Sequence, residues 1–279
     1  MVGMAEFGSL ATAIKLARSS GTSLFCRYCG NETVAVGSKG VCSNCEMPVE
    51  QNQKAFSERN AEIFQTAKSI KSAVGKGDFD SAVKVYEEAF AKYRDPGMLY
   101  AESLVKIKQS NAAIAQIRYD RKGFMEENTA YRNSGAKLVS EAKLLLFKAI
   151  SACNAAMAAG PTPGNAYLLF LCYSKIGNAR ASSNAIGLIE KAGNTYLSMY
   201  ARMAYDSTVR DYKALERDSE AMLNSENFSV NALFYLALAA LRNGNEKYAK
   251  SIMEGAKGFV GSSLTLLQKD MERFEQSLM

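Results

Sequence analysis

Residues 26–45 read CRYCGNETVAVGSKGVCSNC, with one C-x2-C pair at Cys26 and Cys29 and a second at Cys42 and Cys45. Two cysteines three positions apart in a tight turn can place both thiolates on one ion. A second such turn completes the four ligands that zinc prefers in a structural site. The spacing therefore predicts one closed, tetrahedral metal centre.

The rest of the chain offers no imidazole ligand, because it contains no histidine. Four thiolates are then the only complete set of soft ligands, and they leave no coordination position for water or substrate. Gly30 directly follows Cys29 and suits the positive φ that such a turn often needs. We expect one structural Zn²⁺; disulfides, redox-active cysteine pairs and a rubredoxin-like iron site are the alternatives.

The residues between the two cysteine pairs predict a β-hairpin. Residues 33–36 are rich in β-formers, and residues 37–40 contain two glycines that favour a turn. This segment resembles a zinc ribbon, and the resemblance covers residues 24–50. It implies a small β fold around the metal but no particular function.

The composition is that of a protein with a large core in a reducing compartment. The chain has 279 residues, of which 48% are hydrophobic. Lys15 and Arg18 interrupt the apolar N-terminal stretch, which a signal peptide would not allow. We therefore expect a cytoplasmic protein without a disulfide framework. The longest apolar runs, 166–173 and 232–241, are shorter than the roughly 18 residues of a membrane span, so we expect no transmembrane segment.

A spacing pattern recurs in the helical part of the chain. The turn glycine Gly77 is followed by a small residue at +5, a large one at +9 and a small one at +12, and Gly244 repeats this arrangement. Gly177 matches at +5 and +9, and Arg210 lies in phase without a glycine. The three glycines are 100 and 67 residues apart, close to three and two periods of about 33 to 34 residues.

This pattern resembles that of tetratricopeptide-type repeat proteins over residues 55–260. The resemblance implies consecutive helical hairpins, in which small residues in the second helix let the backbones approach. The family favours a large aromatic residue four positions before the turn glycine, where Tyr173 conforms but Ala73 and Ala240 do not. The phase is lost over residues 100–160, which are either an insertion or degenerate repeats.

The predicted fold is therefore mainly α: a tetratricopeptide-like helical-hairpin solenoid with a small N-terminal β zinc ribbon. Residues 1–23 form an amphipathic helix that packs on the ribbon or the first repeats, with membrane-surface binding as the alternative. Residues 24–50 form the ribbon. Residues 55–279 form the helical repeat domain, and residues 262–278 are its capping helix.

Further motifs are read as structural. We expect Cys153 and Cys172 to be buried free thiols, because their neighbours are apolar. Four methionines are expected to fill the core, with an adaptable peptide groove as the alternative. They are Met199, Met203, Met222 and Met253.

Enzymatic motifs are missing from the sequence. It has neither a phosphate-binding loop nor a dinucleotide fingerprint, and without histidine it cannot build an imidazole triad. We therefore expect no enzyme, but a protein–protein interaction adaptor or scaffold. Its concave helical surface would capture a peptide or helix of a protein partner, while the ribbon stiffens one end or makes a second contact.

The alternative is a nucleic-acid- or ribosome-associated factor that uses the ribbon and the basic region 68–132. In that region, basic and aromatic residues alternate in the manner of single-strand binding surfaces. They are Lys106, Lys108, Arg118, Tyr119, Arg121, Lys122 and Phe124. The formal net charge is +6, but residues 1–50 carry four basic and four acidic residues. A neutral ribbon weakens this alternative.

Overall fold

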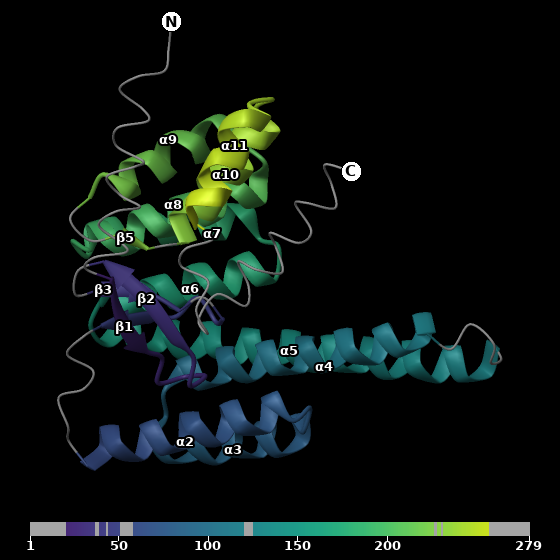
Figure 1. Ribbon diagram of the computed structural model, residues 1–279. Coiled ribbons are helices and arrows are strands. Elements are labelled where there is room, and N and C mark those ends of the chain that lie inside the picture. Colours follow the sequence, from purple (N-terminus) through teal and green to yellow (C-terminus); the bar gives the residue numbers. More distant parts are fainter. Residues whose placement is uncertain are drawn as a thin grey trace, which may run out of the picture.

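The computed structural model describes residues 21–36, 39–42, 44–50, 58–119, 125–225, 228–229 and 231–256. These residues are mostly helical, with four short strands near the N-terminus and one far along the chain (Figure 1). The mainly α fold with a small N-terminal β unit is thus confirmed.

The helices follow one another in the chain and pack consecutively. They are α2 (Glu58–Gly75), α3 (Phe79–Tyr93), α4 (Pro96–Tyr119), α5 (Met125–Ala159), α6 (Pro163–Lys175), α7 (Ala179–Lys191), α8 (Thr195–Val209), α9 (Tyr212–Leu223), α10 (Asn231–Arg242) and α11 (Glu246–Ala256). Helices α4, α6, α8 and α10 also contact one another in series. Two layers of helices result, one from the first and one from the second helix of each hairpin.

The predicted turn at Gly77 has a specific geometry. Gly77 adopts φ 74°, and the N–H of Asp78 donates a 2.9 Å hydrogen bond to the carbonyl of Ala73. The carboxylate of Asp78 accepts from the N–H of Ser81 (3.1 Å) and so caps helix α3. The same pair of bonds is found at the other two predicted turns, Gly177–Asn178 and Gly244–Asn245.

The turn without a glycine follows the same pattern. Arg210 is left-handed at φ 63°, and the N–H of Asp211 bonds to the carbonyl of Asp206. Asp211 then caps helix α9 through the N–H of Ala214 (3.1 Å). The phase of the repeat therefore extends through Arg210, as the sequence predicts.

Two of the helices before these turns, α6 and α10, are buried on most sides. Every residue from 166 to 172 in α6 is buried, as are Leu233, Leu236 and Ala240 in α10. At the predicted small positions, Ala82 and Ala249 are fully buried and Ser182 is 2% exposed. These side chains let the paired helices approach closely.

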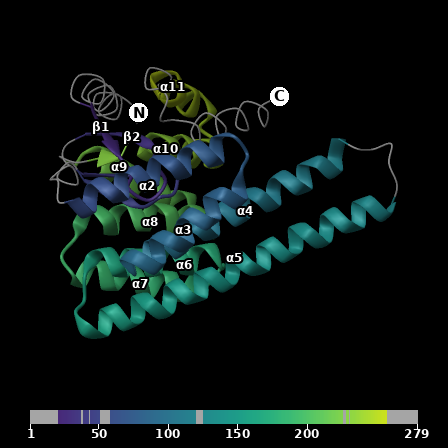
Figure 2. The same ribbon diagram turned by 90° about the horizontal axis from the view of Figure 1, so that it is seen from below.

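Residues 100–160 form the longest helical hairpin of the described chain. Helices α4 and α5 run side by side and extend beyond the other helices (Figures 1 and 2). Val105 and Ala142 are buried, whereas Ile114, Leu144 and Phe147 are exposed. The segment is therefore a hairpin of the stack whose two helices are elongated.

One stretch of this hairpin, Arg132–Ala159, is long and apolar enough to cross a membrane by length and composition. This finding corrects the expectation that no apolar run reaches that length. Its residues Ala142, Leu146 and Cys153 are buried, although only 28% of its apolar window is buried. A core helix has the same composition, so the stretch alone does not indicate a membrane protein.

The strands form two small sheets. Strand β1 (Gly21–Phe25) pairs with β2 (Glu32–Val36), and β3 (Lys39–Val41) pairs with β4 (Pro48–Glu50), both antiparallel. Strand β5 (Phe228–Ser229) adds to the free edge of β2. The prediction of a hairpin between the cysteine pairs is wrong, because β2 and β3 are bonded to different partners.

Several predictions fall outside the described residues. They are the N-terminal helix up to residue 20, the capping helix over 262–278, and Arg121, Lys122 and Phe124. Residues 21–23, assigned to the end of the N-terminal helix, belong instead to strand β1.

Candidate metal centre

Each cysteine pair lies in the turn of its own hairpin. Cys26 and Cys29 lie between β1 and β2, and Cys42 and Cys45 lie between β3 and β4. In both turns the N–H of the first cysteine bonds to a carbonyl five residues later, and its carbonyl accepts from the N–H four residues later, at 2.8 to 2.9 Å. The two turns are thus close structural equivalents and face one another.

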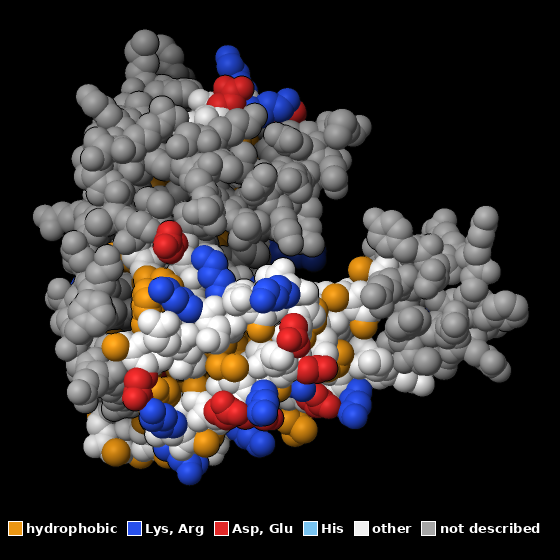
Figure 3. Space-filling view, turned by 60° about the horizontal axis from the view of Figure 1, so that its bottom comes forward, with side chains coloured by type: hydrophobic (Ala, Val, Ile, Leu, Met, Phe, Trp, Pro, Cys, Tyr) orange, Lys and Arg blue, Asp and Glu red, His pale blue; other side chains and the backbone are white. Residues whose placement is uncertain are grey.

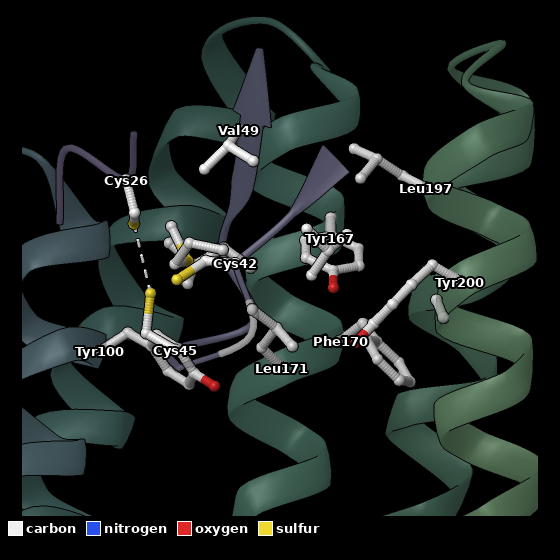
Figure 4. Close-up of a cluster of buried hydrophobic side chains, with 14 of the residues drawn as sticks. Cys26, Cys42, Cys45, Val49, Tyr100, Tyr167, Phe170, Leu171, Leu197 and Tyr200 are labelled. Carbon is white, nitrogen blue, oxygen red and sulfur yellow. Dashed lines mark hydrogen bonds between the residues drawn. The ribbon is translucent and has the colours of Figure 1, made fainter. Parts of the chain in front are cut away.

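The four sulfur atoms converge on one point. All lie within 4.8 Å of one another. The sulfur atoms of Cys26 and Cys45 are 3.5 Å apart (Figure 4), and those of Cys29 and Cys42 are also 3.5 Å apart. A tetrahedral ion with metal–sulfur bonds of about 2.3 Å places its ligands about 3.8 Å apart. The four cysteines can therefore hold one metal ion, and no disulfide joins any of them.

Burial and hydrogen bonding set the protonation of these thiols. Burial raises the pKa of Cys26 and Cys45, while hydrogen bonds from the neighbouring cysteines lower the pKa of Cys29. The most exposed of the four, Cys29, is only 8% exposed. Several thiolates this close together repel one another in a dry site, and a divalent cation at their centre compensates their charge.

The residue after each pair is left-handed. Gly30 has φ 69°, as predicted, and Glu46 at the equivalent position has φ 60°. A Cβ at Gly30 would collide with the carbonyl oxygen of Ala67 in α2. Gly30 is therefore required both by its backbone angle and by the close approach of the helix.

The first turn is tied to α3 and to the start of α4. The hydroxyl of Tyr86 donates a 2.7 Å hydrogen bond to the carbonyl of Tyr28. Arg27 forms a 3.3 Å ion pair with Asp95, and the Tyr28 hydroxyl donates to the same carboxylate at 3.2 Å. Asp95 also accepts from the N–H of Gly97 at the first turn of α4 (2.9 Å).

The second turn is tied to α4 and α6. The hydroxyl of Tyr167 donates to the carbonyl of Glu46 (2.9 Å), and the Glu46 carboxylate pairs with Lys175 (3.0 Å). The ammonium of Lys108 donates to the side-chain oxygen of Asn44 (2.7 Å). The contacts from Tyr167 and Lys175 hold Glu46 in a conformation that non-glycine residues rarely adopt.

The ribbon and the helices share one hydrophobic core. Val49 of β4 and Tyr167, Leu197 and Tyr200 of the helices lie in the same layer beside the cysteines (Figure 4). The ribbon therefore lies along the side of the stack, against α2, α4, α6 and α8. This position differs from the expected one at an end of the stack, because Tyr86, Tyr167 and Lys108 reach it from three consecutive hairpins.

The other predicted residues take structural positions. Cys153 and Cys172 are fully buried free thiols, and burial raises the pKa of Cys153 to about 12. Met203, Met222 and Met253 are buried in the core as predicted, and Met199 is partly buried against it.

The predicted basic stretch is partly engaged within the molecule. Lys106 pairs with Glu141 of α5 (2.9 Å), and Lys108 bonds to Asn44. The face of α2 to α5 shown in Figure 3 carries basic and acidic side chains intermixed, without a continuous basic groove among its described residues. Arg118 and Tyr119 lie at the end of α4.

The chain matches no protein-family model, and no curated protein is significantly similar to it. The site is therefore interpreted from its geometry. Sequence reasoning identified all four cysteines and Gly30, but it missed Glu46, Asp95 and Tyr167. The equivalent spacing of Glu46 and Gly30 after their cysteine pairs was the one signal that could have indicated a left-handed residue at Glu46.

Proposed function

We propose that this protein is a non-enzymatic adaptor or scaffold that binds a partner polypeptide, with a structural Zn²⁺ at the four cysteines. Its hairpins are tetratricopeptide-like. This part of the proposal is supported by a recurring turn, in which a left-handed residue is followed by an Asp or Asn that caps the next helix. The left-handed residues are Gly77, Gly177, Arg210 and Gly244. Its six free thiols suit the reducing conditions of the cytoplasm.

The choice of zinc rests on the donors. Four thiolates from two tight turns are the ligand set typical of structural zinc, and they fill all four tetrahedral positions. Such a centre contributes folding free energy, since its ligands converge only in the folded state. The four cysteines would therefore stabilise the fold through the ion, and they would leave no coordination position for a substrate.

The observation that carries the proposal is the attachment of the metal turns to consecutive hairpins. Tyr86 contacts the first turn, and Lys108 and Tyr167 contact the second. A ribbon held in this way fixes the spacing of α3, α4 and α6. Stacked hairpins of fixed spacing are suited to presenting a preformed surface for binding a partner.

The ribbon also changes where a partner can bind. It covers the parts of α2, α4, α6 and α8 that lie around the cysteines. The expected capture surface would have included these parts of the helices. We therefore propose a partner site where ribbon and helices meet, or on the parts of the hairpins that the ribbon leaves open.

Affinity purification of the full-length chain from its native cell, followed by mass spectrometry, tests the proposal. We expect a defined protein partner that stays bound in high salt and is lost with the Cys45→Ser variant. Recovery of nucleic acid alone would contradict it.

The nucleic-acid alternative has its own test, an electrophoretic shift assay with RNA and DNA at low salt. Phosphate contacts would give a complex that weakens steeply as salt rises. Because Lys106 is paired with Glu141, and basic and acidic side chains are intermixed on the face of α2 to α5 (Figure 3), we expect no such complex. A salt-sensitive complex would support the alternative instead.

A further inference from the structure

A pocket of about 370 Å³ lies where both metal turns meet the helices. Cys29 and Asn31 of the first turn and Asn44 and Cys45 of the second form one wall. Helices α2, α3 and α4 form the others. This volume is near the lower end for ligand-binding pockets, which suits one or two amino-acid residues better than a large ligand.

The floor of the pocket is apolar. It is made by Ile70 and Val74 of α2, Tyr86 of α3, and Leu104 and Val105 of α4. Ile70, Tyr86 and Val105 are buried, whereas Val74 and Leu104 are partly exposed. An aliphatic side chain placed here would lose contact with water and gain contact with three helices.

The rim of the pocket is basic. Lys71 of α2 and Lys108 of α4 line it together with Asn31 and Asn44, and no acidic residue of the described chain does so. Lys108 bonds to an amide oxygen, and neither lysine forms an ion pair within the described residues. Two ammonium groups without carboxylate partners favour an anionic group between them.

We propose that this pocket binds the C-terminal residue of a partner polypeptide. An aliphatic last side chain lies on Ile70 and Val105, and the terminal carboxylate lies between Lys71 and Lys108. The inference deepens the adaptor function and rests on it, because it names the part of the partner that is recognised. Capture of a C-terminal carboxylate is a known mode of peptide recognition.

The lysines have a competing role. A zinc ion with four thiolates carries a net charge of −2, and Lys71 and Lys108 would offset part of it. If that is their only role, removing Lys71 weakens metal binding and leaves no peptide effect to observe. The experiment must therefore measure both quantities.

The probe is acetyl-Gly-Gly-Leu with a free carboxylate, titrated into the zinc-loaded, ¹⁵N-labelled full-length chain. We expect shifts of the amide signals of pocket residues, including Asn31 and Asn44. Amidation of the probe, or glycine in place of its leucine, should weaken binding about tenfold, as the loss of a charge-assisted bond or of an apolar contact does.

Lys71→Gln should weaken binding of the free acid about tenfold and leave metal retention against a chelator unchanged, because Lys71, unlike Lys108, makes no hydrogen bond to a metal turn in the described structure. Lys143→Gln is the matched control, because Lys143 is exposed on α5 and does not line the pocket. Equal binding of acid and amide, shifts away from the pocket, or metal loss without a peptide effect in Lys71→Gln would overturn the proposal. A salt-resistant protein partner recovered in the same cells would then leave the adaptor function standing.

Discussion

The hydroxyl of Tyr167 in α6 donates a 2.9 Å hydrogen bond to the carbonyl of Glu46, across 121 residues of sequence. Glu46 directly follows Cys45, one of the four converging cysteines, and is left-handed. This bond joins the second metal turn to the middle of the helical stack. The metal centre and the helices are therefore expected to lose structure together.

Tyr167→Phe tests this link. The substitution leaves the carbonyl of Glu46 without its hydroxyl donor, and we expect a loss of about 1 to 2 kcal/mol in the free energy of unfolding. Chemical denaturation measures it. Tyr173→Phe is the control on the same helix, because the Tyr173 hydroxyl has no hydrogen bond in the described structure; it should change stability by less than about 0.5 kcal/mol.

Gly30→Ala tests the approach of the first metal turn to α2. The added Cβ would meet the carbonyl of Ala67 at a residue with φ 69°, so we expect a loss of more than about 2 kcal/mol and weaker metal retention. Gly187→Ala is the matched change in helix α7, where a Cβ meets no atom of the described chain. It should stabilise the protein by about 0.5 to 1 kcal/mol. Equal effects of the two variants would argue against the close approach.

Arg210→Gly tests the repeat turn that lacks a glycine. Arg210 is exposed at φ 63°, where glycine avoids a cost of about 1 kcal/mol. We therefore expect a higher melting temperature in a thermal scan. Thr208→Gly, two residues earlier in α8, should lower it, because glycine is a poorer helix former. A lower melting temperature for Arg210→Gly would show that the Arg210 side chain stabilises the protein by more than its left-handed backbone conformation destabilises it.

Glu102 gives a prediction about pH. Glu102 is 4% exposed. Its burial and the nearby carboxylate of Glu87 raise its pKa to about 7, although Lys106 and Lys148 lower it in part. Glu141 also raises it. Since the folded protein holds this proton more tightly than the unfolded chain, Glu102 lowers stability as pH rises from about 4.5 to about 7.

Glu102→Gln removes the loss of stability that the ionisation of Glu102 causes. The variant should be more stable than the parent protein by up to about 3 kcal/mol at pH 8, and the difference should shrink towards pH 6. Urea denaturation at several pH values measures it. A difference that is constant over this range would show that Glu102 keeps an ordinary pKa.

Local sequence signals were enough to predict the convergence of the four cysteines and the repeat turns. Cys26 and Cys45 follow from spacing and thiol chemistry, and Arg210 follows from the phase of the neighbouring turns. Each depends on contacts within a few residues. Such contacts leave a pattern in the sequence that physical rules can interpret.

The position of the ribbon could not be predicted in this way. It depends on single contacts between distant residues, such as Tyr86 with Tyr28 and Tyr167 with Glu46. Strand β5 has two residues and no periodicity that would mark it as a strand. The expected hairpin between the cysteine pairs failed for a similar reason, because strand propensity at residues 33–36 does not specify the partner strand.

The central claim is that a zinc ion at the four cysteines holds the ribbon and the helices together. Elemental analysis of the purified chain, combined with its thermal unfolding before and after chelation, tests it most directly. We expect about one zinc per chain, lost with Cys45→Ser and kept with Cys153→Ser. Chelation should lower the melting temperature of the helices. A chain without bound metal, or one whose helices melt at the same temperature after chelation, would contradict the claim.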